Sequence, residues 1–226
     1  MDSIRYRHEW KHEIRFADLL DIRMRLRAVA EPDPHAVDGR YRIRSLYFDT
    51  PSDRALREKL DGVSRREKFR LRYYNGDTSL IHLEKKIRRG GLGAKFVAEL
   101  TEAEARLLTE GESDWMRECG RPLPEELYRK MQTERLAPRT LVDYIREPFV
   151  YGPGNVRVTL DYDIRTGLSS TDFLNPDCVM IPAGDAPVIL EVKWDEMLPD
   201  IIRAAVQTPN VRAAAFSKYA QCRIYD

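Results

Sequence analysis

Residues 66–74 read Arg66-Glu67-Lys68-Phe69-Arg70-Leu71-Arg72-Tyr73-Tyr74, with a basic side chain at every second position from Arg66 to Arg72. Side chains of a β-strand point alternately to opposite faces. The stretch therefore predicts a strand with its basic groups on one face and Phe69 and Leu71 on the other. Such a regular row of charges is more ordered than a solvated face requires, so the charged faces of the strands are where we look for the function.

The same alternation recurs along the chain. In 79–88 and 156–163, charged or polar residues alternate with Ile, Leu, Val and Tyr. Asn75-Gly76-Asp77 and the glycine-rich 90–93 predict tight reversals, so we expect antiparallel pairing. Segments rich in Tyr, Phe, Val, Ile and Leu give about eight predicted strands, at 4–14, 41–49, 66–74, 79–88, 94–100, 139–146, 156–163 and 188–194.

Between the strands, four stretches predict helices at 16–30, 101–111, 124–137 and 199–206. Thr101-Glu102-Ala103-Glu104 is a capping box at the start of the second, and Gly111 ends it. Asp49 is followed by Thr50-Pro51-Ser52-Asp53, a sequence typical of a turn. We therefore predict that Asp49 is a turn or cap residue before a short helix. With no repeat or long linker, residues 1–226 are expected to form a single α+β domain, a mostly antiparallel sheet with helices on its apolar side.

Composition restricts the class of protein. The 226 residues include 38 basic and 37 acidic ones, so the formal net charge is +1 and local clusters matter more than the total. The three cysteines are widely spaced and form no CxxC pair, which argues against a disulfide framework or a zinc site. No 18-residue apolar span is present and the N-terminus is charged. We expect a soluble cytoplasmic protein without membrane insertion of its own or a signal peptide.

Two interpretations of the charged faces remain open. An antiparallel sheet commonly has one solvated face, on which mixed charges form ordinary cross-strand pairs. Alternatively, eight strands favour a curled sheet with its apolar face against outer helices and its charged face inward. Because unpaired buried charge is costly, such an interior would be a wet tunnel for a polyanion, and Arg and Lys suit phosphate. The interleaved Glu9, Glu84 and Glu191 would then hold a divalent cation that bridges phosphate oxygens.

Seven short motifs follow one another in a recognisable order: RHEWK at 7–11, SLYFDT at 45–50, KFRLR at 68–72, LEKK at 83–86, RVTLD at 157–161, LEVK at 190–193 and FSKY at 216–219. In this order they resemble the VTC polyphosphate polymerase domain, a member of the triphosphate tunnel metalloenzymes. The resemblance covers nearly the whole chain. It implies a closed antiparallel β-barrel of about eight strands with helices packed outside, which binds a nucleoside triphosphate or polyphosphate together with Mn²⁺ or Mg²⁺.

The resemblance also implies roles for individual residues. Glu191 would be the principal metal ligand, with Glu9 and Glu84 as further metal candidates. Arg146 is assigned from the segment 144–149, which precedes the strand of Arg157. The implied phosphate-binding residues are Lys11, Arg70, Arg72, Lys86, Arg146, Arg157, Lys193 and Lys218.

Three functions are compatible with this site. In a polymerase, ATP passes its γ-phosphoryl group to the end of a polyphosphate chain, whose ionised oxygen needs no side-chain base. With water as the acceptor the protein would be a triphosphatase, in which Glu84 could orient the water. A non-catalytic sensor of polyphosphate or nucleotide is the third. Nucleic acid is not expected as a ligand, because the aromatic residues fall on the apolar faces. A separate membrane protein is a candidate partner.

Overall fold

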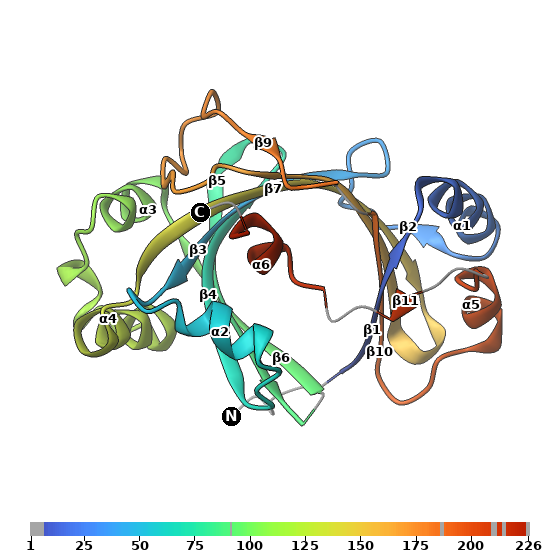
Figure 1. Cartoon of the computed structure of the whole chain (residues 1–226), viewed down its shortest axis with the longest axis horizontal. Coiled ribbons are helices and arrows are strands. Elements are labelled where there is room, and N and C mark those ends of the chain that lie inside the picture. The colour runs from blue at the N-terminus through green and yellow to red at the C-terminus, as the bar shows by residue number, and fades with distance from the viewer. Residues whose placement is uncertain (1–6, 91, 186–187, 209–211, 214–215, 225–226) are drawn as a thin grey trace.

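One antiparallel sheet curls around a concave face and forms the centre of the molecule (Figure 1). The computed structural model describes residues 7–90, 92–185, 188–208, 212–213 and 216–224. The strands are β1 (His8–Ile14), β2 (Glu31–Pro32), β3 (Tyr41–Asp49), β4 (Arg66–Tyr74), β5 (Asp77–Arg89), β6 (Leu92–Leu100), β7 (Ala137–Tyr151), β8 (Val156–Thr166), β9 (Ile181–Pro182), β10 (Val188–Trp194) and β11 (Arg212–Ala213). Their order is β11-β1-β10-β8-β7-β3-β4-β5-β6, with β2 beside β7 and β9 beside β8.

All eight predicted strands are present within the described residues, and β3, β4 and β10 have the predicted bounds; residues 4–6 of the predicted first strand lie outside the described part of the chain. The antiparallel pairing and the α+β class are confirmed. β7 continues beyond the predicted residue 146 to Tyr151, although it contains Pro148, whose carbonyl accepts a hydrogen bond from Asp33 N–H at 3.2 Å. The pattern does not predict β2, β9 and β11, because two residues are too few to show an alternation.

The helices are α1 (Phe16–Val29), α2 (Arg54–Leu60), α3 (Glu102–Thr109), α4 (Pro122–Glu134), α5 (Asp200–Ala205) and α6 (Lys218–Cys222), with 3₁₀ turns at Asp114–Met116 and Pro153–Asn155. The predicted capping box of α3 is present, because Thr101 and Glu104 each accept the other's backbone N–H. Asp49 accepts from Ala55 N–H at 2.8 Å and so binds the first turn of α2. No helix within the described residues is both long and apolar enough to span a membrane.

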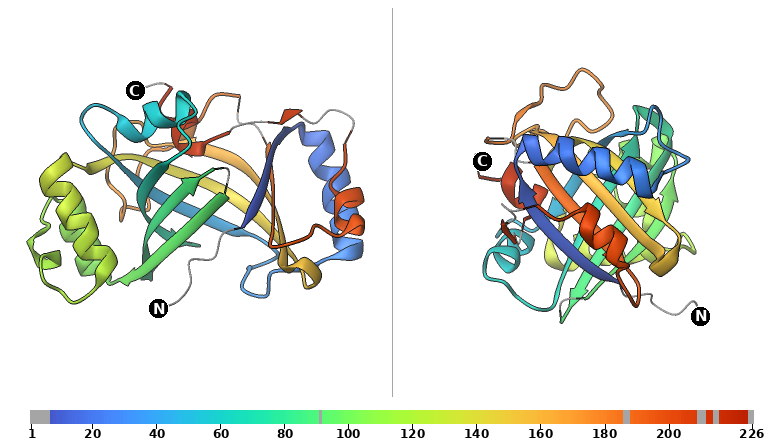
Figure 2. Two further views of the ribbon diagram at one scale, coloured as in Figure 1. Left: turned by 90° about the horizontal axis from the view of Figure 1, so that it is seen from below. Right: turned by 90° about the vertical axis from the view of Figure 1, so that its right-hand side faces the viewer.

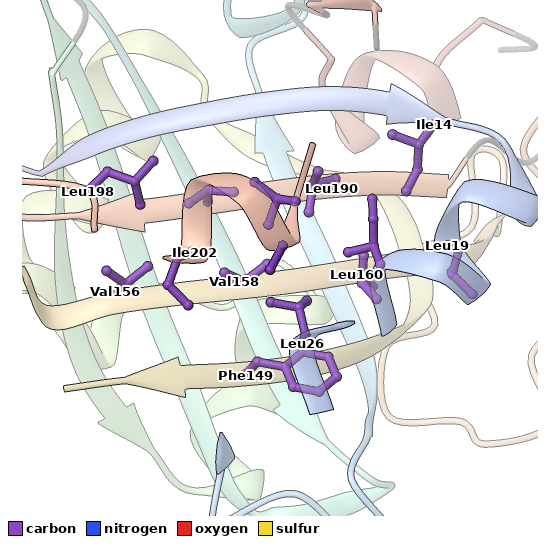
Figure 3. Packing of buried hydrophobic residues seen from close by; sticks show 14 of the residues in the cluster. Ile14, Leu19, Leu26, Phe149, Val156, Val158, Leu160, Leu190, Leu198 and Ile202 are labelled. Carbon is purple, nitrogen blue, oxygen red and sulfur yellow. The ribbon is translucent and has the colours of Figure 1, made fainter. Parts of the chain in front are cut away.

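Two groups of helices pack on the outer, apolar face of the sheet. α1 and α5 lie side by side over β1, β8 and β10 (Figure 2). Their core contains Leu19, Ile22, Leu26, Val158, Leu160, Leu190 and Ile202 (Figure 3). α3 and α4 cover β4 and β5, with a core that contains Phe69, Leu71, Leu83, Leu108 and Leu127. The prediction that the apolar strand faces meet helices is confirmed, and these contacts leave the charged faces on the concave side.

The helix α6 lies on the concave side (Figure 1), so the prediction that the helices pack outside is wrong for this helix. Tyr219 is 1% exposed and stacks on Tyr47, with ring centroids 5.1 Å apart. Its hydroxyl donates to Asp49 at 2.5 Å. Cys222 is buried in the same apolar cluster as Ile43. The concave face is therefore divided into an apolar part covered by α6 and a charged part beside it.

The start of β1, beyond its short pairing with β11, meets the edge strand β6 at a single bridge. A β-bridge joins Arg7 to Gly93, with Arg7 N–H donating to Gly93 O at 3.4 Å. Within the described residues no ladder continues from this bridge along β1 and β6. The described residues thus form a curled, open half-barrel joined by one bridge, and the closed barrel that the resemblance implies is not confirmed.

Candidate functional site

A cavity opens on the concave face beside α6 and has a volume of about 970 Å³, its mouth included. Tyr47, Tyr144 and Phe216 form aromatic parts of its wall, and Glu67 and Glu191 are acidic. The remaining charged residues of the lining are basic: Lys11, Lys59, Arg66, Lys68, Arg70, Arg72, Lys86, Arg88, Arg146, Lys193 and Lys218. Of the two interpretations of the charged faces, the inward-facing one therefore applies to the strands that line this cavity.

On one side of the cavity, β1 and β10 contribute a network of lysines and glutamates. Lys11 Nζ lies 2.7 Å from Glu9 Oε1 and 3.0 Å from Glu191 Oε2. Lys193 forms a further ion pair with Glu191, and Lys86 Nζ approaches Glu9 Oε1 at 3.3 Å. Burial opposes ionisation of Glu191, but Lys11, Lys193 and the other cations outweigh burial and hold its pKa well below the ordinary range. Both carboxylates are therefore ionised and neutralised by lysines.

β4 and β5 form the opposite wall. Arg70 donates to Glu84 Oε2 through Nε at 2.7 Å and to the Tyr47 hydroxyl at 2.8 Å. Arg72 Nε donates to Ser45 Oγ at 3.0 Å, while its Nη2 atom is buried without a hydrogen-bond partner in the described part of the chain. A buried donor without an acceptor costs about 1–3 kcal/mol. A phosphate oxygen in the cavity would provide the acceptor that Arg72 lacks.

A third cluster joins β7, β8 and α6. Arg146 donates to both carboxylate oxygens of Asp161 at 2.7 Å, and Lys218 Nζ lies 2.6 Å from Asp161 Oδ2. Asp161 is fully buried. Burial raises its pKa, but Arg146 and Lys218 outweigh burial and lower the pKa to about 2. Asp161 is thus a permanently charged counter-ion that fixes the orientation of Arg146 and Lys218 beside the cavity.

Where α2 meets the ends of β4 and β5, four basic residues of the lining lie together beside Glu67, and we call them the mouth cluster: Lys59, Arg66, Lys68 and Arg88. Arg66 lies directly opposite Arg88 in the β4–β5 register. Lys68 Nζ donates to Ser217 Oγ at 3.3 Å and lies 4.8 Å from the ring centroid of Tyr219. Burial, then the neighbouring Arg66 and Lys59, lower the pKa of Lys68 to about 7. Within the mouth cluster, the positive charges of Arg66 and Lys59 thus make protonation of Lys68 less favourable.

Most predicted site residues line this cavity: Lys11, Arg70, Arg72, Lys86, Arg146, Lys193, Lys218 and Glu191. Glu9 adjoins it through its ion pairs with Lys11 and Lys86. Arg157 does not line it, because its guanidinium donates to Asp33 at 2.7 Å. Asp33 follows the unpredicted strand β2. Phosphate binding by Arg157 stays a prediction, made for a residue that lies outside this lining.

Glu84 also lies outside the lining of the cavity. Its side chain is 1% exposed and lies behind the cavity wall. One oxygen accepts from Arg70 and the other from Lys95, at 2.7 and 3.0 Å. Glu84 is absent from the lining, whereas Glu191, whose oxygens are also paired, is part of it. Glu84 therefore serves as a counter-ion of the basic wall, and its position does not support the metal-binding or water-orienting role, which stays a prediction.

The carboxylates fit a divalent cation only in a limited way. Within the described residues no group of three or more His, Cys, Asp or Glu side chains is placed to hold a metal. Mg²⁺, however, is commonly bound through one or two carboxylates together with substrate phosphates and water. Glu191 and Glu9, which share Lys11, match that pattern. The residues thus fit a cation that binds together with a phosphate ligand, and they do not fit a metal site made by protein alone.

Several lining residues were not among the predicted site residues: Tyr47, Lys59, Arg66, Lys68, Arg88, Tyr144 and Ser217. For Arg66, Lys68 and Arg88 the signal was present in the alternation of β4 and β5. No comparable signal marks Lys59, since it reaches the cavity from α2, a helix packed beside β4.

Comparison with known proteins gives three results. The family described as VTC domain matches residues 6–224. No curated protein matches the chain. Among solved structures, HpAC1 from Hippeastrum, proposed to be an adenylyl cyclase and described as having a dominant triphosphatase activity, has a TM-score of 0.58 at 12% identity, covering 96% of this chain and 94% of that one.

A protein of Bacillus halodurans proposed to be an adenylate cyclase is also similar, with a TM-score of 0.50 at 13% identity, covering 84% of this chain and 80% of that one. At these identities the two structures show a shared fold alone. The family match, by contrast, extends over nearly all of the sequence. The curled antiparallel sheet around a basic cavity is consistent with both findings. The chain therefore belongs to the VTC domain family and shares its fold with these two structures.

Proposed function

We propose that this chain is a polyphosphate polymerase that transfers the γ-phosphoryl group of ATP to the end of an inorganic polyphosphate chain. One observation carries the proposal: the buried acidic groups around the cavity, Glu9, Glu84, Asp161 and Glu191, are all ion-paired and all have lowered pKa values. Groups of this kind are poor general bases for activating water. A terminal phosphate oxygen is already ionised at neutral pH and needs no base.

The basic walls would position the phosphates. Phosphoryl transfer passes through a loose transition state, so positioning and neutralisation of charge supply most of the catalysis. Arg70, Arg72 and Lys86 would contact the phosphate chain from one side. Lys11, Arg146 and Lys218 would contact it from the other. Since counter-ions already fix these cations in place, little reorganisation is needed during the reaction.

The acidic pair of the cavity has a separate role in the proposal. Glu191, assisted by Glu9, would hold Mn²⁺ or Mg²⁺, and the bound cation would neutralise charge on the phosphate oxygens. In the protein alone Lys11 bridges these two carboxylates at 2.7 and 3.0 Å. Lys11 would then turn from a counter-ion of Glu9 and Glu191 into a partner of the phosphates.

A second candidate function is a metal-dependent triphosphatase. The fold similarity to HpAC1, described as having a dominant triphosphatase activity, favours it. In that reaction water replaces the end of the polyphosphate chain as the acceptor, while the same cations bind the triphosphate. The two candidates therefore share their binding residues and differ in the nucleophile.

The deciding experiment incubates the purified protein with ATP and Mn²⁺ and follows the products by phosphorus NMR and by gel electrophoresis. We expect long polyphosphate from the wild type. Lys86→Ala and Glu191→Ala should lower its formation by about 100-fold or more, because each removes a charge aimed at the transferred group. Glu102→Gln is the matched control, since Glu102 forms a surface ion pair with Arg106 on α3 and should leave the rate unchanged.

Other products would replace the proposal. Orthophosphate alone, lost in the same two variants, would establish the triphosphatase. Tight triphosphate binding without any turnover would leave a sensor. Polyphosphate formation that persists in Glu191→Ala would exclude Glu191 as the residue on which the reaction depends.

A further inference from the structure

The β4–β5 ladder changes character along the cavity. Deep in the cavity, Arg70 lies opposite Glu84, an attractive pair. Two residues nearer the mouth, Lys68 lies opposite Lys86. Four residues nearer the mouth, Arg66 lies opposite Arg88. Like charges directly opposite each other destabilise a sheet. Lys86 has an internal carboxylate partner in Glu9, at 3.3 Å, so Arg66–Arg88 is the pair for which an external negative charge would supply the missing counter-ion.

The deep and mouth cations also differ in their counter-ions. In the deep part, Lys11, Arg70 and Arg146 each lie within 3.0 Å of a carboxylate oxygen. Among the described residues, Arg66 and Arg88 form no ion pair, and Arg66 Nη1 donates to the backbone carbonyl of Val63 at 2.6 Å. The deep charges are thus compensated within the fold, while those of Arg66 and Arg88 are not.

Carboxylates near the mouth do not change this balance. Glu58 and Glu9 favour the charged form of Arg66 from a distance, but burial and Arg88 outweigh them, so the pKa of Arg66 is lowered. Glu58 is itself paired with Arg54 at 3.7 Å. Glu67 forms ion pairs with Lys85 and Lys130. The acidic residues closest to the mouth are therefore engaged elsewhere or too distant to neutralise it.

The basic row is longer than a triphosphate needs. Arg72, Arg70, Lys68 and Arg66 occupy alternate positions on one face of β4, and all four line the cavity. Six residues of an extended strand span roughly 20 Å. Three linked phosphoryl groups cover only part of that distance, so a triphosphate placed among the paired deep cations would leave the mouth cluster unoccupied.

We propose that the mouth cluster is a second phosphate subsite, which binds the polymeric part of an inorganic polyphosphate chain while the reacting end lies among the deep cations. The inference rests on the proposed function, because it takes polyphosphate as the substrate of the same cavity. Its chemistry is that of a linear polyanion. Each phosphate unit along the strand meets another cation, and the negative charge removes the repulsion between Arg66 and Arg88.

Equilibrium binding tests the proposal without relying on turnover. Calorimetry would compare tripolyphosphate with medium-chain polyphosphate, for the wild type and for the double variant Arg66→Gln/Arg88→Gln. We expect the double variant to bind polyphosphate about tenfold more weakly, since two charge-assisted contacts are lost, and tripolyphosphate within a factor of about two. Lys59→Gln, which alters α2 and leaves the ladder intact, should weaken polyphosphate binding selectively. Arg129→Gln, exposed on α4, is the matched control.

Unchanged tripolyphosphate binding also shows that a variant is folded. Equal weakening for both ligands, or no weakening for polyphosphate, would overturn the mouth subsite while leaving the proposed function intact. So would a wild type that binds medium-chain polyphosphate no more tightly than tripolyphosphate. A wild type that binds neither ligand would overturn the subsite and the proposed function together.

Discussion

Arg70 and Arg66 lie four residues apart on the same face of β4, yet their surroundings differ. Arg70 donates to Glu84 and Tyr47, whereas Arg66 faces Arg88 across the ladder. The side chain of Glu84 is 1% exposed, so the deep charges belong to the folded core. The difference indicates that the deep cations contribute to folding as well as to binding. At the mouth, by contrast, the repulsion between Arg66 and Arg88 lowers the stability of the fold.

The largest effect should follow from breaking the deep ion pairs. Glu84→Gln leaves the buried Arg72 and the half-buried Arg70 without their carboxylate. Removing one partner of a buried ion pair typically lowers the free energy of unfolding by about 3–5 kcal/mol. We expect a loss of this size for Glu84→Gln in chemical denaturation. The native structure should also regain part of the loss when tripolyphosphate is added, because phosphate would replace the missing charge beside Arg70.

The control is an ion pair of the same chemistry at the surface. Glu102 pairs with Arg106 at 2.8 Å, with side chains 46% and 54% exposed. Exposed pairs contribute about 0–1 kcal/mol, so Glu102→Gln should change stability little. A Glu84→Gln protein as stable as the Glu102→Gln protein would contradict the assignment of the deep charges to the core.

Lys68 is the member of the mouth cluster nearest to Arg70 along β4, and it provides a pH test. Burial, then Arg66 and Lys59, lower its pKa to about 7. Bound phosphate favours the protonated lysine, so binding takes up a proton above about pH 7. The contribution of Lys68 alone should therefore lower the affinity for medium-chain polyphosphate by up to about tenfold per pH unit between roughly pH 7 and 9. The groups that face Lys68 are Arg66, Lys59, Asp49, Lys11, Lys86, Ser217 and Tyr219, of which Asp49 favours its charged form.

Lys68→Arg should remove the share of this slope that Lys68 contributes, because arginine stays charged over the whole range. Lys86 supplies a remaining share, since Lys11 and then burial lower its pKa to about 7. Lys130→Arg, altered on the outer side of the wall, is the matched control and should keep the full slope. Calorimetric titrations at several pH values would measure how the affinity for polyphosphate depends on pH. An unchanged slope in Lys68→Arg would contradict the prediction.

Much of the fold could be predicted because alternation is a local property of the chain. The residues of β4 show both faces of the strand within nine positions, and its bounds follow directly. α6 could not be found in this way, since five residues hold little periodicity. Its position on the concave side depends on Tyr219 reaching Asp49, which is 170 residues away in sequence. The curl of the sheet and the bridge between Arg7 and Gly93 likewise depend on distant segments.

The candidate site shows the same limit. Strand alternation and the ordered motifs brought Arg70, Arg72 and Glu191 to one face, and all three line the cavity. Neither the alternation nor the motifs could predict which acidic side chain pairs with which basic one. Arg157 is engaged by Asp33, 124 residues away, and Glu84 by Lys95 on the neighbouring strand. Pairing of this kind depends on three-dimensional neighbours, and it decides which charges remain available to a ligand.

The smallest expected effect has the opposite sign and comes from the mouth. Arg88→Gln removes one member of the repulsive Arg66–Arg88 pair. Relief of a like-charge cross-strand pair is worth roughly 0.2–1 kcal/mol, so we expect the free energy of unfolding at low salt to stay the same or rise by that amount. At high salt the gain should shrink, because screening weakens the repulsion in the wild type as well. Arg106→Gln, which breaks the surface pair with Glu102, should show no gain. A loss of more than about 1 kcal/mol in Arg88→Gln would mean that Arg88 stabilises the fold, and the contrast between the deep cations and the mouth cluster would then fail.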